Sequence, residues 1–179
     1  METIIEFIAV LFSIVSVALA LKQSVHNWTT GIVGLLAYAV IFYQQKLYAD
    51  MILQFLFIGM GVWGYLEWTG KIKKFEPKAM TIREKDNLLH FMCILFLMCW
   101  FFFSTYTDNK MPGFDSLATV LSIYATILMI QKNRNCWHIW MAADVVYVII
   151  FLCNRMYLSA SLYVVFFFMA KNGYRQWTK

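Results

Sequence analysis

Four side chains between residues 137 and 147 have the types and the spacing to bind a flat cation. At 100° per residue, Trp137, Trp140, Asp144 and Tyr147 fall on one face of a helix. Indole rings can stack on an aromatic ligand, and a carboxylate can neutralise its positive charge. Each such contact contributes about 0.5–2 kcal/mol when it is desolvated. This face predicts a substrate site for a flat, cationic small molecule.

Asp144 stands in an apolar run, so its carboxylate needs an explanation. A charged side chain at that depth of a membrane costs about 2.5–3.5 kcal/mol on insertion scales unless it faces a partner or water. Acids inside membranes are functional by default, which favours a ligand. The alternative is a hydrogen bond from Asp144 to a neighbouring helix with a purely structural role. The sequence leaves both interpretations open.

Polar residues elsewhere extend the candidate site. Gln54 lies in an apolar segment and needs a partner, either another helix or a ligand, and we favour the ligand. Asp50, one turn earlier, is expected near the outer surface, where it can also cap a helix start. Asn172 stands near the C-terminus and can reach the ligand. The tyrosines Tyr38 and Tyr163 complete the predicted set.

Patterns that indicate catalysis do not occur in the sequence. It contains no HExxH, no GxSxG and no glycine-rich nucleotide loop. The four cysteines form no CxxC pair and lie within or at the ends of apolar runs, as small buried hydrophobes do. We therefore predict a protein that is not an enzyme, has no catalytic residues, holds no metal and uses no cofactor.

An internal repeat organises the chain that positions these residues. Residues 28–68 and 137–177 align without a gap at a shift of 109, with 11 identities over 41 positions. The shared residues include Trp28/Trp137, Tyr38/Tyr147 and Gly64/Gly173. Shared residues are expected to serve the fold, and departures in one copy are expected to serve function. Trp140 replaces Gly31 and Asp144 replaces Leu35, which singles out the second copy. In a membrane chain, such a repeat points to a transporter with its substrate site between the halves.

The composition is that of a membrane protein. Hydrophobic residues make up 61% and charged residues 14%, with a mean hydropathy of +0.63. A soluble domain is nearer half apolar and a quarter charged, so lipid is the expected solvent. We predict an all-α, polytopic protein of seven membrane helices at roughly 20 residues each. They are expected at 4–21, 30–46, 49–69, 84–104, 116–132, 136–153 and 156–175.

These spans form three helices, a linker helix and three helices. The predicted division is a first repeat at 1–69, a polar loop and linker helix at 70–115, and a second repeat at 116–179. A single linker span leaves both triplets pointing the same way, so the repeat is parallel.

The positions of the basic residues predict the orientation. Three Lys and Arg residues lie on the side that holds the N-terminus and twelve on the other side. The positive-inside rule places the N-terminus outside and the C-terminus in the cytoplasm. The net charge of +5 follows from this loop bias and does not indicate nucleic-acid binding. Trp28, Trp68 and Trp177 fall at the predicted cytoplasmic ends, where an aromatic belt is expected. Glu67, beside them, is expected to be solvated.

Two stretches of the sequence resemble PnuC-type vitamin transporters. The first runs from Asn27-Trp28 through Tyr48-Ala49-Asp50-Met51-Ile52-Leu53-Gln54 to Gly64-Tyr65-Leu66-Glu67-Trp68. The second comprises Trp137-xx-Trp140, Asp144-Val145-Val146-Tyr147, Tyr157-Leu158-Ser159-Ala160 and Gly173-Tyr174-Arg175-Gln176-Trp177. Together they cover essentially the whole chain.

The resemblance implies a 3+1+3 fold like that of SWEET sugar transporters, as a homotrimer in the bacterial inner membrane. It implies facilitated diffusion of nicotinamide riboside or another vitamin, drawn inward by a cytoplasmic kinase that phosphorylates the product. Trp137 and Trp140 would stack on the base, and Gln54 and Asn172 would hydrogen-bond its polar groups. Thiamine, also a flat aromatic cation, is the nearest alternative substrate. A vitamin-binding membrane sensor that moves nothing is the alternative from another class.

Overall fold

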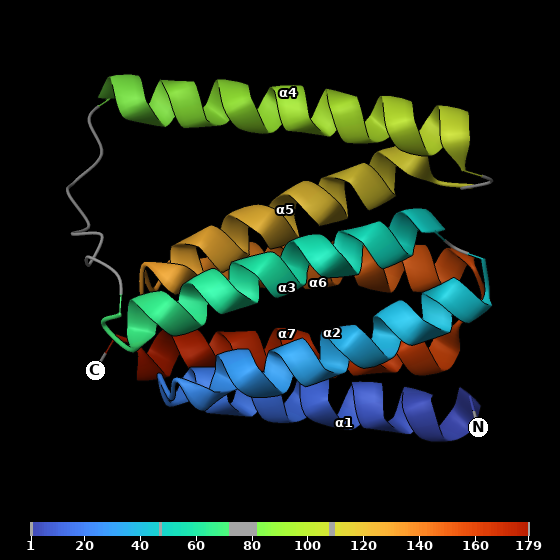
Figure 1. Cartoon of the computed structure of the whole chain (residues 1–179). Helices are drawn as coiled ribbons and strands as arrows, with labels where there is room; N and C mark the ends of the chain where they lie inside the picture. Colours follow the sequence, from blue (N-terminus) through green and yellow to red (C-terminus); the bar gives the residue numbers. More distant parts are fainter. Residues whose placement is uncertain (1, 47, 72–81, 108–109, 179) are drawn as a thin grey trace. The chain divides into compact units, whose positions relative to one another are not determined.

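The part of the chain that the structure describes forms seven helices, in the order that the sequence predicts (Figure 1). The computed structural model describes residues 2–46, 48–71, 82–107 and 110–178, and these ranges contain helices without strands. The helices are α1 (Glu2–Leu21), α2 (His26–Gln44), α3 (Tyr48–Trp68), α4 (Ile82–Tyr106), α5 (Pro112–Ile130), α6 (Cys136–Cys153) and α7 (Tyr157–Gln176). The prediction of an all-α chain of seven helices is therefore confirmed. Most of the predicted polar loop at 70–83 lies outside the described residues.

Two helices begin about a turn earlier than the apolar pattern predicts. In α2, Thr29 and Thr30 donate hydrogen bonds to the backbone oxygen of His26 at 3.0 and 2.8 Å, which allows polar residues in the first turn. In α5, Pro112 occupies the first turn, where its missing N–H costs nothing and its fixed φ suits a helix. Hydropathy alone does not detect either start.

The backbone shows the internal repeat directly. Among the residues that the structure describes, four non-glycine residues have positive φ, and they form two pairs whose members are 109 residues apart. Gln23 and Lys132 have φ of 52° and 53°, and Lys46 and Arg155 have φ of 61° and 60°. Each follows a helix in the left-handed conformation that closes a helix C-terminus. The turns between the first and second helices, and between the second and third, are thus the same in both copies.

Side-chain packing repeats as well. An added Cβ at Gly64 would lie 2.5 Å from the Trp28 ring, and one at Gly173 would lie 2.5 Å from the Trp137 ring. In each triplet, the indole of the second helix therefore packs against the backbone of the third helix at a glycine. Trp28 is only 6% exposed, so its assignment to a lipid-facing belt is wrong. The shared tryptophans hold the helices of each triplet together, which is the kind of close approach that glycine permits.

Backbone contacts divide the chain into two compact units. The first holds Met1–Phe75 with Arg175–Lys179, and the second holds Glu76–Tyr174. In the first unit α1 packs on α2 and α2 on α3, and in the second α4 packs on α5 and α5 on α6. The predicted domain boundaries at residues 69 and 115 stay a prediction.

An aromatic cluster joins the C-terminal segment to the rest of the first unit. Trp28 meets Trp68 edge-on with the ring centroids 5.4 Å apart, and Trp68 lies 6.2 Å from Trp177. The Trp177 Nε1 donates to the backbone oxygens of Ala20 and Leu21 at 3.1 and 3.2 Å. These carbonyls end α1 and have no partner within their own helix. Trp177 therefore caps α1.

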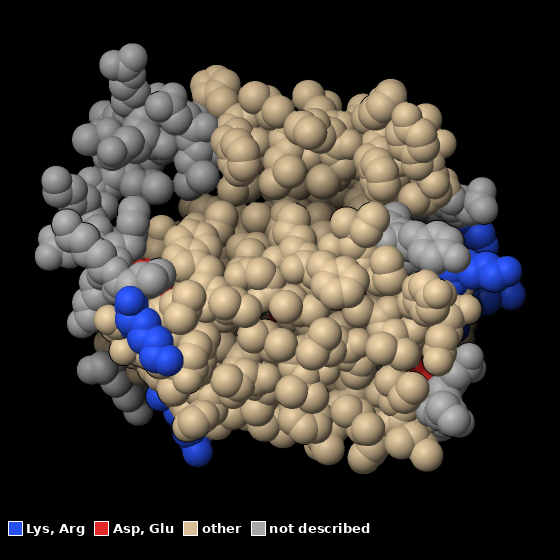
Figure 2. Space-filling view, viewed as in Figure 1, with Lys and Arg blue, Asp and Glu red and all other residues tan. Residues whose placement is uncertain are grey.

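The helix surfaces suit a bilayer. In the described ranges, four helices contain stretches long and apolar enough to cross a bilayer, namely Ile4–Leu21, Asp50–Trp68, Pro112–Ile130 and Cys136–Cys153. Large apolar side chains are exposed, for example Met98 and Phe101 at 64% each. Figure 2 shows Lys and Arg side chains near the helix ends, with a broad surface of other residues between them. A soluble protein rarely exposes so much apolar surface, whereas lipid accepts it.

Candidate functional site

The inner face of α6 carries the strongest candidate site. Trp137 and Asp144 are buried, and Trp140 and Tyr147 are half-buried. Val145 and Ile149, on the opposite side of the same helix, are exposed. The helical spacing thus turns the four predicted residues away from the surface of the second unit.

Asp144 is buried without a protein partner. Only 4% of its surface is exposed, and its carboxylate makes no hydrogen bond or ion pair with the residues that the structure describes. A buried acid is normally paired, because leaving it unpaired costs free energy. No helix–helix hydrogen bond within the described residues supports the structural interpretation of Asp144.

The two tryptophans of α6 differ in what surrounds them. Trp137 is 1% exposed and lies on Gly173, in the same way that Trp28 lies on Gly64. Trp140 has no counterpart ring, because Gly31 holds its position in the first copy. The Trp140 Nε1 is buried and has no hydrogen-bond partner among the described residues. A role in the fold thus accounts for the burial of Trp137, whereas Trp140 is the indole that the second copy adds.

Sequence reasoning missed a row of hydroxyls on α5. Ser116, Thr119, Ser122 and Thr126 lie on one face of this helix and are all buried. The equivalent residues of α1 are Phe7, Val10, Ser13 and Val17, so three of the four positions change from apolar to polar. Comparing the two copies at α1 and α5 would have found them. The stretch remains apolar enough to cross a membrane despite these hydroxyls, so the span prediction passed over them.

Two of these hydroxyls bond to their own helix, and Ser122 does not. Ser116 Oγ donates to the backbone oxygen of Pro112 at 2.6 Å, and Thr126 Oγ1 to that of Ser122 at 2.7 Å. The Ser122 Oγ is buried and has no hydrogen-bond partner among the described residues. On α5 and α6, the Asp144 carboxylate, the Trp140 N–H and the Ser122 hydroxyl therefore have no hydrogen-bond partner within the described part of the chain.

The structure brings the predicted tyrosines of the second unit together. The ring centroids of Tyr147 and Tyr163 are 4.6 Å apart, and Phe151 lies 5.3 Å from Tyr163. In the first unit Tyr38 stacks on Phe42 at 6.1 Å and 22°, nearly as Tyr147 stacks on Phe151 at 6.2 Å and 20°. The position of Tyr163 is taken by Gln54 in the first copy. The aromatic pair belongs to the repeat, and the third residue differs between the copies.

The remaining predicted residues are less enclosed. Gln54 and Asp50 are half-buried residues of the first unit, and the Gln54 Nε2 donates to the backbone oxygen of Asp50 at 3.4 Å. This bond within α3 is a partner that the sequence analysis did not consider. Asn172, near the end of α7, is exposed. Glu67 is only 8% exposed, so the expectation that it is solvated is wrong.

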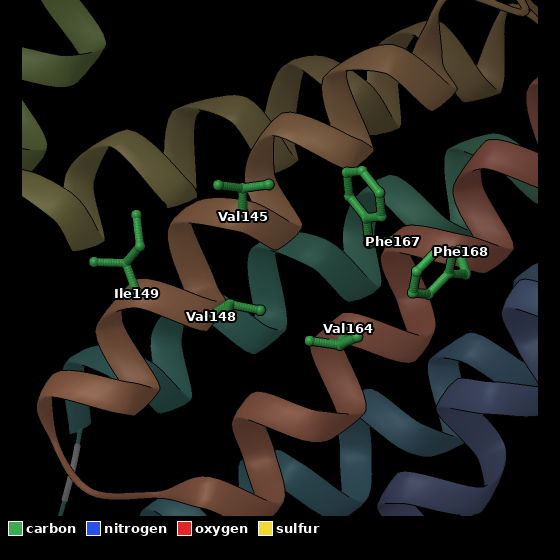
Figure 3. Close-up of a pocket in the computed structure, with 6 residues that line it drawn as sticks. All are labelled: Val145, Val148, Ile149, Val164, Phe167 and Phe168. Carbon is green, nitrogen blue, oxygen red and sulfur yellow. The ribbon is translucent and has the colours of Figure 1, made fainter.

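A groove on the outer side of the second unit is not the candidate site. It runs between α6 and α7 and is lined by Val145, Val148, Ile149, Val164, Phe167 and Phe168 (Figure 3). All six side chains are apolar, so this groove offers nothing that could orient a polar ligand. Its surface suits lipid chains. Within the described ranges, no group of three His, Cys, Asp or Glu residues could hold a metal ion.

Comparison with known proteins gives this arrangement its context. The profile of the family described as "Nicotinamide mononucleotide transporter" matches residues 3–179. The chain belongs to this family. It is therefore a polytopic membrane transporter and not an enzyme, and the resemblance to PnuC-type transporters is confirmed.

Curated relatives and a solved structure agree with the family. The nicotinamide riboside transporter PnuC of Escherichia coli (strain K12) is 25% identical over 201 residues, covering 97% of this chain and 84% of the relative. That of Neisseria mucosa is also 25% identical, over 187 residues and with 96% and 71% coverage. A crystal structure of the vitamin B3 transporter PnuC matches with a TM-score of 0.75 at 21% identity, over 97% of this chain and 80% of that one. This last likeness concerns the fold alone.

Proposed function

We propose that this transporter carries nicotinamide riboside into the cell by facilitated diffusion. The observation that carries the proposal is the buried Asp144, which has no hydrogen bond or ion pair to the described residues and shares its helix face with the indole of Trp140. A pyridinium ring would stack on Trp140 and bring its positive charge to Asp144. The relatives from Escherichia coli and Neisseria mucosa are nicotinamide riboside transporters, which supports this choice of substrate.

The other predicted residues have secondary roles in this proposal. Tyr147 and Tyr163 form an aromatic wall that extends the Trp140 face. Trp137 supports that face from its place on Gly173. Gln54, Asp50, Tyr38 and Asn172 stay predictions from the sequence, and substitution of each will decide its part.

Binding by purified protein is the first test. Titration of nicotinamide riboside, followed by calorimetry or tryptophan fluorescence, should give saturable binding. Trp140→Ala should weaken it roughly 2- to 30-fold, the equivalent of one stacking and cation–π contact. Trp100→Ala is the matched control, since Trp100 is an exposed tryptophan on α4 of the same unit. Folded wild-type protein that shows no binding would contradict the proposed substrate.

Thiamine is the alternative candidate for the substrate, because it is also a flat aromatic cation. Displacement of bound nicotinamide riboside by thiamine at similar concentrations would mean that the site recognises only the charge and the shape of its ligand.

A flux measurement distinguishes a transporter from a sensor. In proteoliposomes, labelled substrate should equilibrate across the bilayer and continue to do so after a protonophore is added. Binding without flux would favour the sensor, and loss of uptake with the protonophore would mean proton coupling.

We further propose an inner-membrane location, with the N-terminus outside, the C-terminus in the cytoplasm and a homotrimeric assembly. The three-to-twelve distribution of Lys and Arg supports the orientation, and labelling of single cysteines placed at the two termini tests it. A cytoplasmic kinase that traps the product should raise net uptake when it is enclosed in the proteoliposomes with ATP. Light scattering of the detergent-solubilised protein measures the assembly.

A further inference from the structure

The proposed function gives a role to the Asp144 carboxylate and the Trp140 N–H, but none to the Ser122 hydroxyl. Asp144 and Trp140 serve the base of the ligand. The Ser122 hydroxyl on α5 is 3% exposed and has no hydrogen-bond partner among the described residues. A buried hydroxyl without a partner forfeits a hydrogen bond that water would have supplied, so a partner is expected to fill the place.

Packing places Ser122 at the same level of the α5–α6 hairpin as Asp144. Ala118 of α5 packs with Val146 and Ile150 of α6. The two helices are antiparallel neighbours joined by a short loop. One helical turn from the level of Ala118 toward this loop reaches Ser122 on α5 and Asp144 on α6, so these two residues lie at the same level.

The first copy gives the same register independently. There, an added Cβ at Gly34 would lie 3.2 Å from the Ser13 Oγ. Gly34 corresponds to Ala143, the neighbour of Asp144, and Ser13 corresponds to Ser122. The hydroxyl and the carboxylate therefore occupy one layer of the second unit.

The chemistry of a pyridinium nucleoside connects this layer to the sugar. Its positive charge sits on the ring nitrogen that bears the glycosidic bond, so the ribose is attached at the charged atom. A carboxylate that faces the charge has ribose hydroxyls beside it. We propose that Ser122 is the sugar subsite of the transporter, and that its Oγ hydrogen-bonds a ribose hydroxyl of the nucleoside held by Trp140 and Asp144. This inference rests on the proposed function.

The subsite makes the second copy selective for a nucleoside. A serine hydroxyl both donates and accepts, which matches a sugar hydroxyl. In the first copy the equivalent Ser13 Oγ already donates to the backbone oxygen of Ala9 at 2.8 Å. Thiamine carries no sugar on its charged nitrogen, so it leaves the Ser122 hydroxyl unpaired. A site built to bond a hydroxyl rejects ligands that lack it.

The experiment measures affinities of nicotinamide riboside and its 2′-, 3′- and 5′-deoxy analogues for the full-length protein in detergent. Ser122→Ala should weaken nicotinamide riboside binding roughly 3- to 10-fold, the effect of one hydrogen bond. One deoxy analogue should lose the same factor on the wild-type protein and nothing further on Ser122→Ala. Ser13→Ala is the matched control and should bind all four ligands as the wild type does. Thermal unfolding of each variant checks the fold.

The outcomes separate this subsite from the substrate proposal. If the wild type binds nicotinamide riboside and Ser122→Ala leaves all four affinities unchanged, or lowers all four alike, the sugar subsite is overturned. A lower unfolding midpoint with unchanged ligand selectivity would assign Ser122 to a structural water instead. Should Ser122→Ala fail to fold, equal affinity of the wild type for all three analogues and for nicotinamide riboside overturns the subsite by itself. Absence of nicotinamide riboside binding to the wild type would overturn the proposed function, and the subsite with it.

Discussion

The two copies of the repeat share a frame and differ in chemistry. In both, an indole packs on a glycine, a tyrosine stacks on a phenylalanine, and residues at equivalent positions adopt the left-handed conformation after a helix. The second copy alone adds Trp140, Asp144 and three of the four buried hydroxyls of α5, those of Ser116, Thr119 and Thr126. Ser122 is a serine in both copies, but only its counterpart Ser13 bonds to its own helix. The other common residues determine how a triplet packs, and we expect the departures, together with Ser122, to mark where it binds.

The largest expected effect concerns Asp144, whose counterpart Leu35 shows that the frame needs no acid there. Asp144→Leu should lose about 2–4 kcal/mol of binding, roughly 30- to 1,000-fold in Kd, because the ligand's charge loses its partner. The same change should raise the free energy of unfolding by about 1–3 kcal/mol, since an unpaired buried carboxylate is removed. Calorimetry and thermal unfolding in detergent measure the two effects. Asp144→Asn separates charge from size.

A loss of binding affinity together with a gain of stability in Asp144→Leu would support a ligand-binding role for Asp144. If Asp144→Leu lowers stability and leaves affinity unchanged, the acid has a structural role. The second copy would then differ from the first in packing, and its departures would not mark a site.

The two glycines test the shared frame. Gly64→Ala and Gly173→Ala should each cost about 1–3 kcal/mol of stability, because the new methyl group meets an indole ring. Gly59→Ala on α3 is the matched control, since an added Cβ there meets nothing within 4 Å. Unfolding measurements on the three variants suffice. A clear loss for one glycine and none for its counterpart would mean that the two triplets pack differently.

Gln54 tests the reverse asymmetry, because here the first copy holds the more polar residue and the second holds Tyr163. Gln54→Leu should weaken nicotinamide riboside binding by about 1 kcal/mol, roughly fivefold, if the amide contacts the ligand. Stability should not fall, since leucine suits an apolar span and only a long bond within α3 is lost. Gln44→Leu at the end of α2 is the control. Unchanged affinity in Gln54→Leu would confine the ligand contacts to other residues.

The sequence predicted the helices well, because apolar runs of about 20 residues have one solution in a membrane. It also placed Trp137, Trp140, Asp144 and Tyr147 on the inner face of α6, because helical periodicity is regular. It could not separate the buried Trp137 from Trp140, since that distinction depends on Gly173 of another helix. It missed the α5 hydroxyls because they lie far in sequence from the residues they accompany. The pattern within one helix shows which residues share a face of that helix, whereas the contacts between helices can be identified only from the packed structure.

The smallest expected effect concerns Trp177, the counterpart of Trp68. Its Nε1 caps α1 by donating to the backbone oxygens of Ala20 and Leu21. Trp177→Phe keeps a ring beside Trp68 and removes the donor, so it should cost about 0.5–1.5 kcal/mol of stability. Thermal unfolding of Trp177→Phe and Trp177→Leu separates the hydrogen bond from the ring contact. Binding should be the same in both variants, because Trp177 lies in the first unit and the proposed subsites on α5 and α6 lie in the second. If Trp177→Phe weakens binding without lowering stability, residues common to both copies also act on the ligand, and the division between frame and site would have to be redrawn.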